Sequence, residues 1–274
     1  MIQSPEVTET PQRADAVADS GYGRVFADFY DRLFPRDAGA EQTARTLAEW
    51  HPGGRALELG VGTGRIALPL ARRTGEVVGV DSSPEMLERL RAAIGEAAPP
   101  TPPVSPVHGD IRCWADGTAY GLVYCVCATL SMLLDPAEQR AAIATAVRHL
   151  APGGTLVVET HNPAFVRALH EGRTHATWFA PYPEPGTGLQ TYSTLVGGDV
   201  WHASHLWHEG GTVRVGSELS RLTTPDEVDA YAVAAGLVPV SRHGDWAGTA
   251  FTDGSPLQIN RYTFPSEDGD HGQD

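Results

Sequence analysis

The chain has 274 residues, a formal net charge of −14 at pH 7 and a hydrophobic fraction of 41%. This length predicts one α/β domain with an appended element. No apolar run approaches the ~18 residues that a membrane-spanning helix needs, so we expect no membrane partner. All 20 basic residues are arginine, which excludes lysine Schiff-base chemistry and a lysine-containing phosphate loop.

The acidic surplus is concentrated near the two ends of the chain. Residues 1–20 and 266–274 carry more acidic than basic side chains, which predicts two disordered segments around a folded domain at 21–265. No arginine-rich stripe occurs, which argues against nucleic acid as a partner. The mildly acidic body favours a neutral or cationic small molecule. Three cysteines without C-x-x-C spacing form no disulfide framework, so we expect a cytoplasmic protein.

Strands and helices alternate along the first part of the domain. Two helices, at 22–34 and 40–50, precede a first strand at 55–59. Further strands are predicted at 76–81, 104–108, 121–127 and 155–160, with helices at 65–73, 84–95 and 136–149 between them. This alternation predicts a parallel sheet with right-handed crossovers and with helices on both faces.

The pattern changes after the fifth strand. Residues 188–222 alternate around a turn at 209–211, which predicts an inserted antiparallel hairpin or small sheet. A helix at 225–235 and strands at 237–243 and 257–264 follow. The expected fold is therefore α/β, with a Rossmann-like, seven-stranded and mostly parallel sheet and an inserted antiparallel β element. We expect that element either to form the wall of a pocket or to form a homodimer interface.

A glycine-rich turn joins the first strand to the next helix. Gly60, Gly62 and Gly64 follow a G-x-G-x-G spacing, not the G-x-G-x-x-G of a dinucleotide site. Glu58 lies two residues earlier, where its carboxylate would repel a pyrophosphate and suit a cationic cofactor or an amino-acid ammonium. Asp81 ends the second strand, the place at which a nucleotide ribose presents two hydroxyls. These residues predict an adenosine-type cofactor at the carboxyl edge of the sheet.

Four segments extend this pattern in a set order. They are ELGVGTGR at 58–65, VVGVDSSPEML at 77–87, HGDI at 108–111 and LAPGGTLVVE at 150–159. In sequence and spacing they resemble the class I S-adenosylmethionine-dependent methyltransferases of the small-molecule type. The resemblance implies S-adenosylmethionine as cofactor and S-adenosylhomocysteine as product.

The resemblance also assigns cofactor contacts to individual residues. Gly60, Gly62 and Gly64 would pack against the methionine part, and Asp81 would bind the ribose hydroxyls. The adenine contacts would come from Ser82 or Met86 at its border, the Asp110 carboxylate at its amino group and the Ile111 amide at a ring nitrogen.

Three residues are candidates for the acid–base work of methyl transfer. His161 directly follows the fifth strand, and a neutral imidazole can take the proton that an alcohol or phenol must lose. The alternative is that His161 caps a turn with Asn162. Tyr30 and Asp31, in the N-terminal aromatic segment, are the other candidate bases. By resemblance, Tyr22 and Tyr30 cover the cofactor.

A histidine-rich stretch raises the question of a metal site. His202, His205 and His208 lie within seven residues, but alternation along a strand points His205 away from the other two. Three ligands cannot converge from one strand in that phase, so we expect no metal. Trp201 and Trp207 share the face of His205 and either wall an aromatic acceptor pocket or pack in a core.

These features together predict a methyltransferase that acts on O or N of a small molecule in secondary metabolism. The alternative is an enzyme of the same fold that uses S-adenosylmethionine without methyl transfer, for cyclisation or decarboxylation. A nicotinamide oxidoreductase would need the missing G-x-G-x-x-G spacing. A non-catalytic sensor would bind S-adenosylmethionine without turnover.

Overall fold

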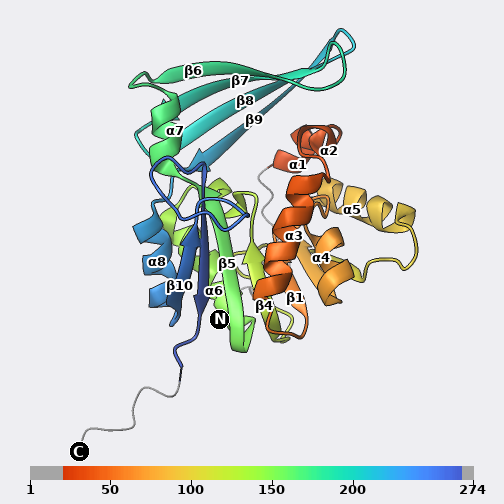
Figure 1. The fold of residues 1–274 in the computed structure, drawn as a ribbon, viewed down its shortest axis with the longest axis vertical. Helices are drawn as coiled ribbons and strands as arrows, with labels where there is room; N and C mark the ends of the chain where they lie inside the picture. Colours follow the sequence, from red (N-terminus) through yellow and green to blue (C-terminus); the bar gives the residue numbers. More distant parts are fainter. Residues whose placement is uncertain (1–20, 267–274) are drawn as a thin grey trace, which may run out of the picture.

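The computed structural model describes residues 21–266 of the chain (Figure 1). The predictions for residues 1–20 and for the tail beyond residue 266 lie outside this range. A seven-stranded sheet with helices on both faces forms the body, and a four-stranded antiparallel sheet lies across one end of it. Within residues 21–266, none of the helices combines the length and the apolar character needed to cross a bilayer.

The body is built on a sheet with the strand order β10-β11-β5-β4-β1-β2-β3. The strands are β1 Ala56–Leu59, β2 Val77–Asp81, β3 Val104–His108, β4 Tyr120–Cys125, β5 Leu150–His161, β10 Val238–His243 and β11 Leu257–Thr263. Strands β1 to β5 run parallel, whereas β11 pairs antiparallel with both β5 and β10. The predicted fold class is confirmed. The strand order reverses between β1 and β4, and ligands of such sheets bind outside the carboxyl ends at that point.

Apolar side chains hold the helices on the two faces of this sheet. Helices α3 (Ala38–Trp50), α4 (Ala67–Thr74) and α5 (Pro84–Glu96) share one buried cluster with alternate strand residues. Helices α6 (Pro136–Arg148) and α8 (Pro225–Ala234) share the other. Burying each large aliphatic side chain contributes about 1.5–3 kcal/mol, so these two layers account for most of the favourable energy of the body.

The N-terminal aromatic segment forms two short helices rather than the single helix predicted at 22–34. They are α1 (Tyr22–Phe26) and α2 (Tyr30–Leu33), and both begin without a side-chain cap. Phe26 and Phe29 are buried against Trp207 of the inserted sheet and Met86 of α5. The segment is therefore held by aromatic packing across the carboxyl edge of the sheet.

The inserted element is larger than the predicted 188–222. Four strands, β6 (His175–Pro181), β7 (Gly188–Val196), β8 (Val200–Glu209) and β9 (Thr212–Arg221), pair antiparallel in chain order. A short helix, α7 (Pro163–Leu169), connects β5 to β6. Strand β6 is an edge strand that is exposed along most of its length, so its sequence lacks the clean alternation that predicts a half-buried strand.

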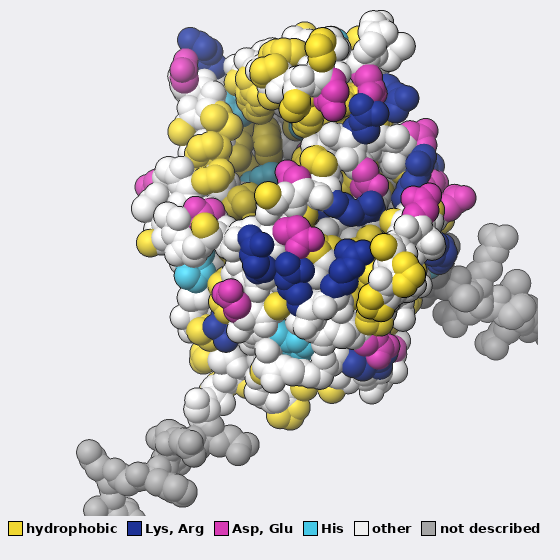
Figure 2. Space-filling view, turned by 45° about the vertical axis from the view of Figure 1, so that its right-hand side comes forward, with side chains coloured by type: hydrophobic (Ala, Val, Ile, Leu, Met, Phe, Trp, Pro, Cys, Tyr) yellow, Lys and Arg dark blue, Asp and Glu magenta, His cyan; other side chains and the backbone are white. Residues whose placement is uncertain are grey.

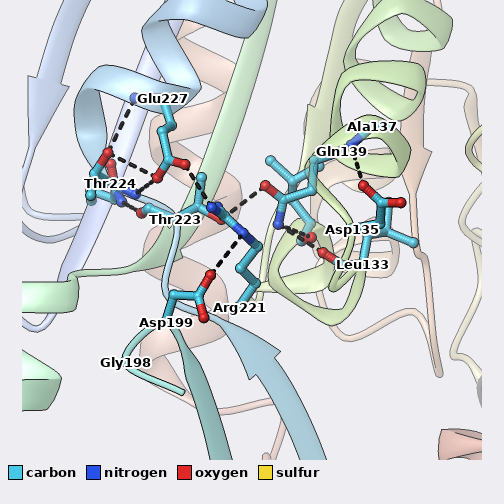
Figure 3. Close-up of polar contacts among 12 residues, drawn as sticks. Leu133, Asp135, Ala137, Gln139, Gly198, Asp199, Arg221, Thr223, Thr224 and Glu227 are labelled. Carbon is cyan, nitrogen blue, oxygen red and sulfur yellow. Dashed lines mark hydrogen bonds and ion pairs between the residues drawn. The ribbon is translucent and has the colours of Figure 1, made fainter. Parts of the chain in front are cut away.

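Polar side chains tie the end of the inserted sheet to the body (Figure 3). Arg221 donates to Glu227 at 2.7 Å, and its Nε lies 3.8 Å from Asp199. Thr223, which follows β9, donates to the amide oxygen of Gln139 in α6 at 2.9 Å. Thr223 and Gln139 are both fully buried. This network sets the direction in which the inserted sheet leaves the body.

Candidate active site

A cavity of about 480 Å³ lies at the carboxyl edge of the central sheet. Its walls come from the loops after β1, β2, β3 and β4, from the end of β5, from α1 and α2, and from β9 of the inserted sheet. Figure 2 shows a hollow below the top of the molecule, with hydrophobic and histidine side chains on its wall. The cavity therefore joins segments that lie far apart in the sequence.

The glycine turn forms one wall of this cavity. Gly60 and Gly62 line it and both have positive φ, 83° and 54°. A Cβ on Gly62 would meet nothing within 4 Å, so the backbone there faces open space that a ligand can fill. Gly64 has a different role, because it is not a lining residue and a Cβ there would lie 2.4 Å from Leu90. Of the three glycines, Gly64 serves helix packing.

Asp81 is placed at the rim of the glycine turn. One carboxylate oxygen accepts from the Gly62 amide and the other from the Ser83 amide, each at 2.8 Å. Ser82 and Met86, which follow Asp81 at the start of α5, also line the cavity. This carboxylate is held in one orientation, as hydrogen bonding to two vicinal hydroxyls requires.

Glu58 is buried at the bottom of the cavity, with 2% of its surface exposed. The Tyr124 hydroxyl donates to it at 2.9 Å. Burial raises the pKa of the Glu58 carboxyl to about 8, while Tyr124 and the nearby Arg65 oppose that rise. Bringing a cationic group next to Glu58 would favour its charged form, so the site fits a cationic ligand.

The Asp110 segment forms the opposite wall. Asp110 and Ile111 both line the cavity. The Arg112 guanidinium binds the Asp110 carboxylate at 2.6 Å and also pairs with Glu138, and Arg112 lowers the pKa of Asp110. Asp110 therefore stays an acceptor at neutral pH. With Ile111 and Leu133 as apolar neighbours, this wall fits a flat heterocycle.

The N-terminal residues divide between the cavity and its surroundings. Tyr22 and Tyr30 line the cavity and contact each other edge to face at 6.3 Å. Burial raises the pKa of the Tyr30 hydroxyl far above neutrality, which does not suit a general base. Asp31 is not a lining residue; its carboxylate accepts from Thr63 at 2.6 Å and from Arg36 at 3.2 Å. The geometry thus gives Asp31 a role in holding the loop.

His161 lies at the end of β5 and lines the cavity. Its ring meets Trp201 of the inserted sheet edge to face at 4.8 Å. Burial lowers the pKa of His161 and the neighbouring His205 lowers it further, while the Glu218 carboxylate partly offsets both. The imidazole is therefore neutral at pH 7 and can accept a proton. The turn is capped by Asn162, whose side chain accepts from Ala164.

The side chains of the histidine-rich strand β8 lie alternately on its two faces, as the sequence predicts. Trp201 and Trp207 are buried on the inner face, where His205 also lies. On the neighbouring strand β9, Leu219 lies opposite His202 and Val213 lies opposite His208. Both of these β9 side chains are exposed. Within the part of the chain that the structure describes, no group of three or more His, Cys, Asp or Glu side chains is placed to hold a metal ion.

Several lining residues were not singled out from the sequence. Glu218 and Ser220 come from β9, and Arg65, Cys127 and Glu159 come from the body. Arg65 donates to the Cys127 thiol at 2.9 Å, and Cys127 itself has a positive φ of 55° just beyond β4. Alternation in β9 does put positions 218 and 220 on one face, which is a signal for them, but it does not say what that face meets.

Known proteins with similar sequence and structure identify the family. Residues 56–154 match a family model described as a methyltransferase domain. The CcbJ methyltransferase from Streptomyces caelestis superposes with a TM-score of 0.79 and 32% identity, over 89% of this chain and 98% of that one. The amino pentose methyltransferase CalS10 from Micromonospora echinaspora has a TM-score of 0.62 and 25% identity, over 86% of this chain and 94% of that one.

The curated relatives bear the name of a different activity. The carboxy-S-adenosyl-L-methionine synthase of Salmonella paratyphi C is 32% identical over 150 residues, which are 53% of this chain and 59% of that protein. The chain thus spans less than two thirds of the length of this relative. The match to a methyltransferase structure over 89% of this chain at 32% identity assigns the chain to one family. The chain belongs to the class I S-adenosylmethionine-dependent methyltransferases.

Proposed function

We propose that the protein transfers a methyl group from S-adenosylmethionine to a nitrogen or oxygen of a small molecule, with S-adenosylhomocysteine as the second product. The observation that carries this proposal is the composition of the cavity. One part of its wall holds the glycine turn, Asp81 and Asp110, and the rest holds His161 and Glu218 from other elements. The cavity therefore has side chains for a cofactor and further polar side chains for a second molecule.

The cofactor part of the cavity suits both ends of S-adenosylmethionine. Asp81 would hold the ribose hydroxyls, and Asp110 with the Ile111 amide would hold the adenine. At the amino-acid end, Glu58 suits the ammonium. Arg65 suits the carboxylate, because its Nε is buried without a partner among the described residues.

His161 would assist the acceptor in the remaining part of the cavity. S-adenosylmethionine supplies a methyl group on a sulfonium, which a nucleophile displaces in line. Alignment of the reacting groups in an enclosed cavity accounts for up to ~7–11 kcal/mol of barrier lowering in intramolecular models. A neutral imidazole that takes the proton of the acceptor adds typically ~10²–10⁴-fold. We assign that role to His161, in preference to Tyr30 and Asp31.

A second candidate function is a reaction that uses S-adenosylmethionine without methyl transfer. The match to the carboxy-S-adenosyl-L-methionine synthase favours it, because that protein modifies the cofactor itself. The two candidates differ in products. Methyl transfer yields S-adenosylhomocysteine and a methylated acceptor in equal amounts, whereas a synthase of this kind consumes the cofactor without S-adenosylhomocysteine appearing in proportion.

Calorimetric titration with S-adenosylmethionine tests the proposal, with NADH as the control ligand. We expect micromolar binding by the wild type, no binding of NADH, and loss of binding by Asp81→Ala. An acceptor screen read out by S-adenosylhomocysteine release then tests the reaction. Wild-type protein that binds NADH, or neither ligand, would refute the assignment of the cavity. The non-methylating alternative is supported if the cofactor is consumed without S-adenosylhomocysteine.

We further propose that the protein is cytoplasmic and that it forms a homodimer through the outer face of the inserted sheet. Val213, Val215 and Leu219 of β9 and Tyr192 and Val196 of β7 are exposed on this face. Two copies of a chain with net charge −14 repel each other elsewhere, so an uncharged apolar face favours self-association. Sedimentation equilibrium of the wild type and of Val215→Glu tests this, and a monomeric wild type contradicts it.

A further inference from the structure

We propose that Glu218 makes the acceptor part of the cavity selective for a protonated amine, and that His161 takes the proton which this amine must lose. The proposal rests on the methyl-transfer function and names the class of its acceptor. It stands on one juxtaposition: a carboxylate of the inserted sheet and an imidazole of the central sheet line the same cavity.

The inserted sheet holds the Glu218 carboxylate in place. On the inner face, Glu218 of β9 is the diagonal neighbour of His205 of β8, whose Nε2 lies 3.1 Å from one carboxylate oxygen. The other ring nitrogen of His205 lies 3.2 Å from the Thr191 hydroxyl of β7. Because a carboxylate only accepts hydrogen bonds, this contact puts the His205 proton on Nε2. Three strands thus fix the orientation of Glu218.

The space around this carboxylate is shaped by two small residues. Ala203 lies directly opposite Glu218 on β8, and Gly216 lies opposite His205. A Cβ on Gly216 would lie 2.6 Å from the Phe26 ring, so the missing side chain lets α1 close against the sheet. With 16% of its side chain exposed, Glu218 faces the cavity rather than bulk solvent.

One oxygen of Glu218 is available to a ligand. His205 is the hydrogen-bond partner of its Oε1, and among residues 21–266 the other oxygen has none. The other carboxylate in this part of the cavity, Glu159, is already engaged, because Trp246 donates to it at 2.6 Å. Arg65, the nearby cation, donates to Cys127. Glu218 is therefore the negative group whose charge a bound acceptor can balance.

These charges discriminate between acceptor classes. A protonated amine gains a charge-assisted hydrogen bond from Glu218 in a largely enclosed site, where such a bond is strongest. A neutral alcohol offers one ordinary hydrogen bond and brings no positive charge to the carboxylate. A phenolate or a carboxylate in the same place is repelled. The site therefore favours an amine over a hydroxyl compound of the same shape.

The bound amine must lose one proton before it can act as a nucleophile. His161 is placed to receive it, because its ring lines the same cavity and is neutral at pH 7. The proton passes from the acceptor nitrogen to the imidazole, which leaves a lone pair on nitrogen. As the N–C bond forms, the C–S bond breaks and its electron pair stays on sulfur. His161 then returns the proton to water.

Two cofactor analogues test whether Glu218 favours a positively charged group in the cavity. The test does not require the acceptor to be known. In sinefungin a carbon replaces the sulfur and carries an ammonium at the position of the reacting methyl, whereas S-adenosylhomocysteine has no group and no charge at that position. The variants are Glu218→Gln and the matched control Glu184→Gln, which neutralises an exposed carboxylate in the loop between β6 and β7. Dissociation constants are measured by calorimetry for both analogues.

We expect Glu218→Gln to weaken sinefungin binding about tenfold to a hundredfold, the range for a lost hydrogen bond between charged groups. Binding of S-adenosylhomocysteine should change less than about twofold, and Glu184→Gln should leave both analogues as in the wild type. Equal effects of Glu218→Gln on both analogues, or none on either, overturn the proposal. Wild-type protein that binds neither analogue instead overturns the proposed function, which keeps the two failures distinct.

Titration of His161 by nuclear magnetic resonance is a second measurement. It separates an effect of the Glu218 charge from an effect of lost packing. Burial lowers the pKa of His161, the Glu218 charge raises it, and His205 lowers it. Removing the Glu218 charge should therefore move the titration of His161 to lower pH, and Glu184→Gln should not move it. An unshifted titration in a folded Glu218→Gln variant shows that the two groups do not interact and contradicts the proposal.

Discussion

The hydroxyl of Thr223 donates to the amide oxygen of Gln139 at 2.9 Å, and this buried bond joins the inserted sheet to helix α6. The same Gln139 amide donates to the Leu130 and Leu133 carbonyls at 3.1 and 2.9 Å. Leu133 lines the cavity. One side chain thus connects the inserted sheet to the wall of the site (Figure 3).

Replacing Gln139 by leucine should destabilise the fold. The substitution removes the acceptor of the Thr223 hydroxyl proton and the donor to the Leu133 carbonyl in a buried place, and each unsatisfied group costs about 1–3 kcal/mol. We expect a total loss of about 2–5 kcal/mol, measured by urea unfolding. The control Gln190→Leu, at a half-buried position of β7 whose side chain donates to the exposed Tyr192 hydroxyl, should change the free energy of unfolding by less than about 0.5 kcal/mol. A Gln139→Leu variant as stable as the wild type would contradict this account.

The glycine turn offers a matched pair of substitutions. Gly62→Ala places a methyl group in the open space of the cavity, whereas Gly64→Ala places it against Leu90. Both positions have positive φ, which costs about 1–2 kcal/mol with a side chain. We expect Gly62→Ala to weaken S-adenosylmethionine binding more than stability, and Gly64→Ala to do the reverse. Calorimetry and thermal unfolding of the two variants check this, and identical profiles would count against it.

Glu58 should make stability depend on pH. Its pKa is raised from 4.5 to about 8 in the folded state, so the folded protein holds a proton that the unfolded chain releases. The stabilising contribution is complete below pH 4.5 and is lost as the pH rises to about 8. The slope within this window is up to about 1.4 kcal/mol per pH unit. Glu58→Gln should remove that part of the slope; urea unfolding at several pH values measures it.

The same carboxyl should couple cofactor binding to proton release. A cationic ammonium beside Glu58 favours its charged form, so binding of S-adenosylmethionine near pH 7 should release a proton. Affinity should then increase as the pH rises from 6 toward 8. Calorimetry in phosphate and in Tris, whose ionisation enthalpies differ, counts the protons. A wild type that releases no more protons than Glu58→Gln would show that the ammonium binds elsewhere.

Substitutions of the two candidate bases should differ in their effect on kcat. We expect His161→Asn to lower kcat by about 10²–10⁴-fold with the affinity for S-adenosylmethionine unchanged, because proton transfer contributes that much. Asp31 does not line the cavity; Asp31→Asn removes an acceptor of the Thr63 and Arg36 hydrogen bonds and should lower kcat by less than about tenfold. Below the lowered pKa of His161, wild-type kcat should fall as the imidazole becomes protonated. The reverse ranking of the two variants would move the base to Asp31.

Local signals in the sequence determined most of the central sheet and the cofactor half of the site. Strands β1, β2 and β4 are short apolar runs, and helices α5 and α6 each begin with a capping side chain followed by proline. The order of the elements then admits few topologies. Glu58, Gly60, Gly62, Asp81 and Asp110 sit at the ends of such runs, and the carboxyl ends of parallel strands meet at one edge.

The tertiary structure alone decided the acceptor half of the site. Glu218 lies in the middle of a strand, and alternation says which face it shares but not that this face closes over His161. Asp31 is next to a lining residue in sequence yet is turned toward Thr63. The inserted sheet is positioned by long-range contacts, such as that of Gln139 with Thr223, which no local pattern encodes. Side chains from separate elements meet only after the sheet has docked, so their chemistry is a property of the folded chain.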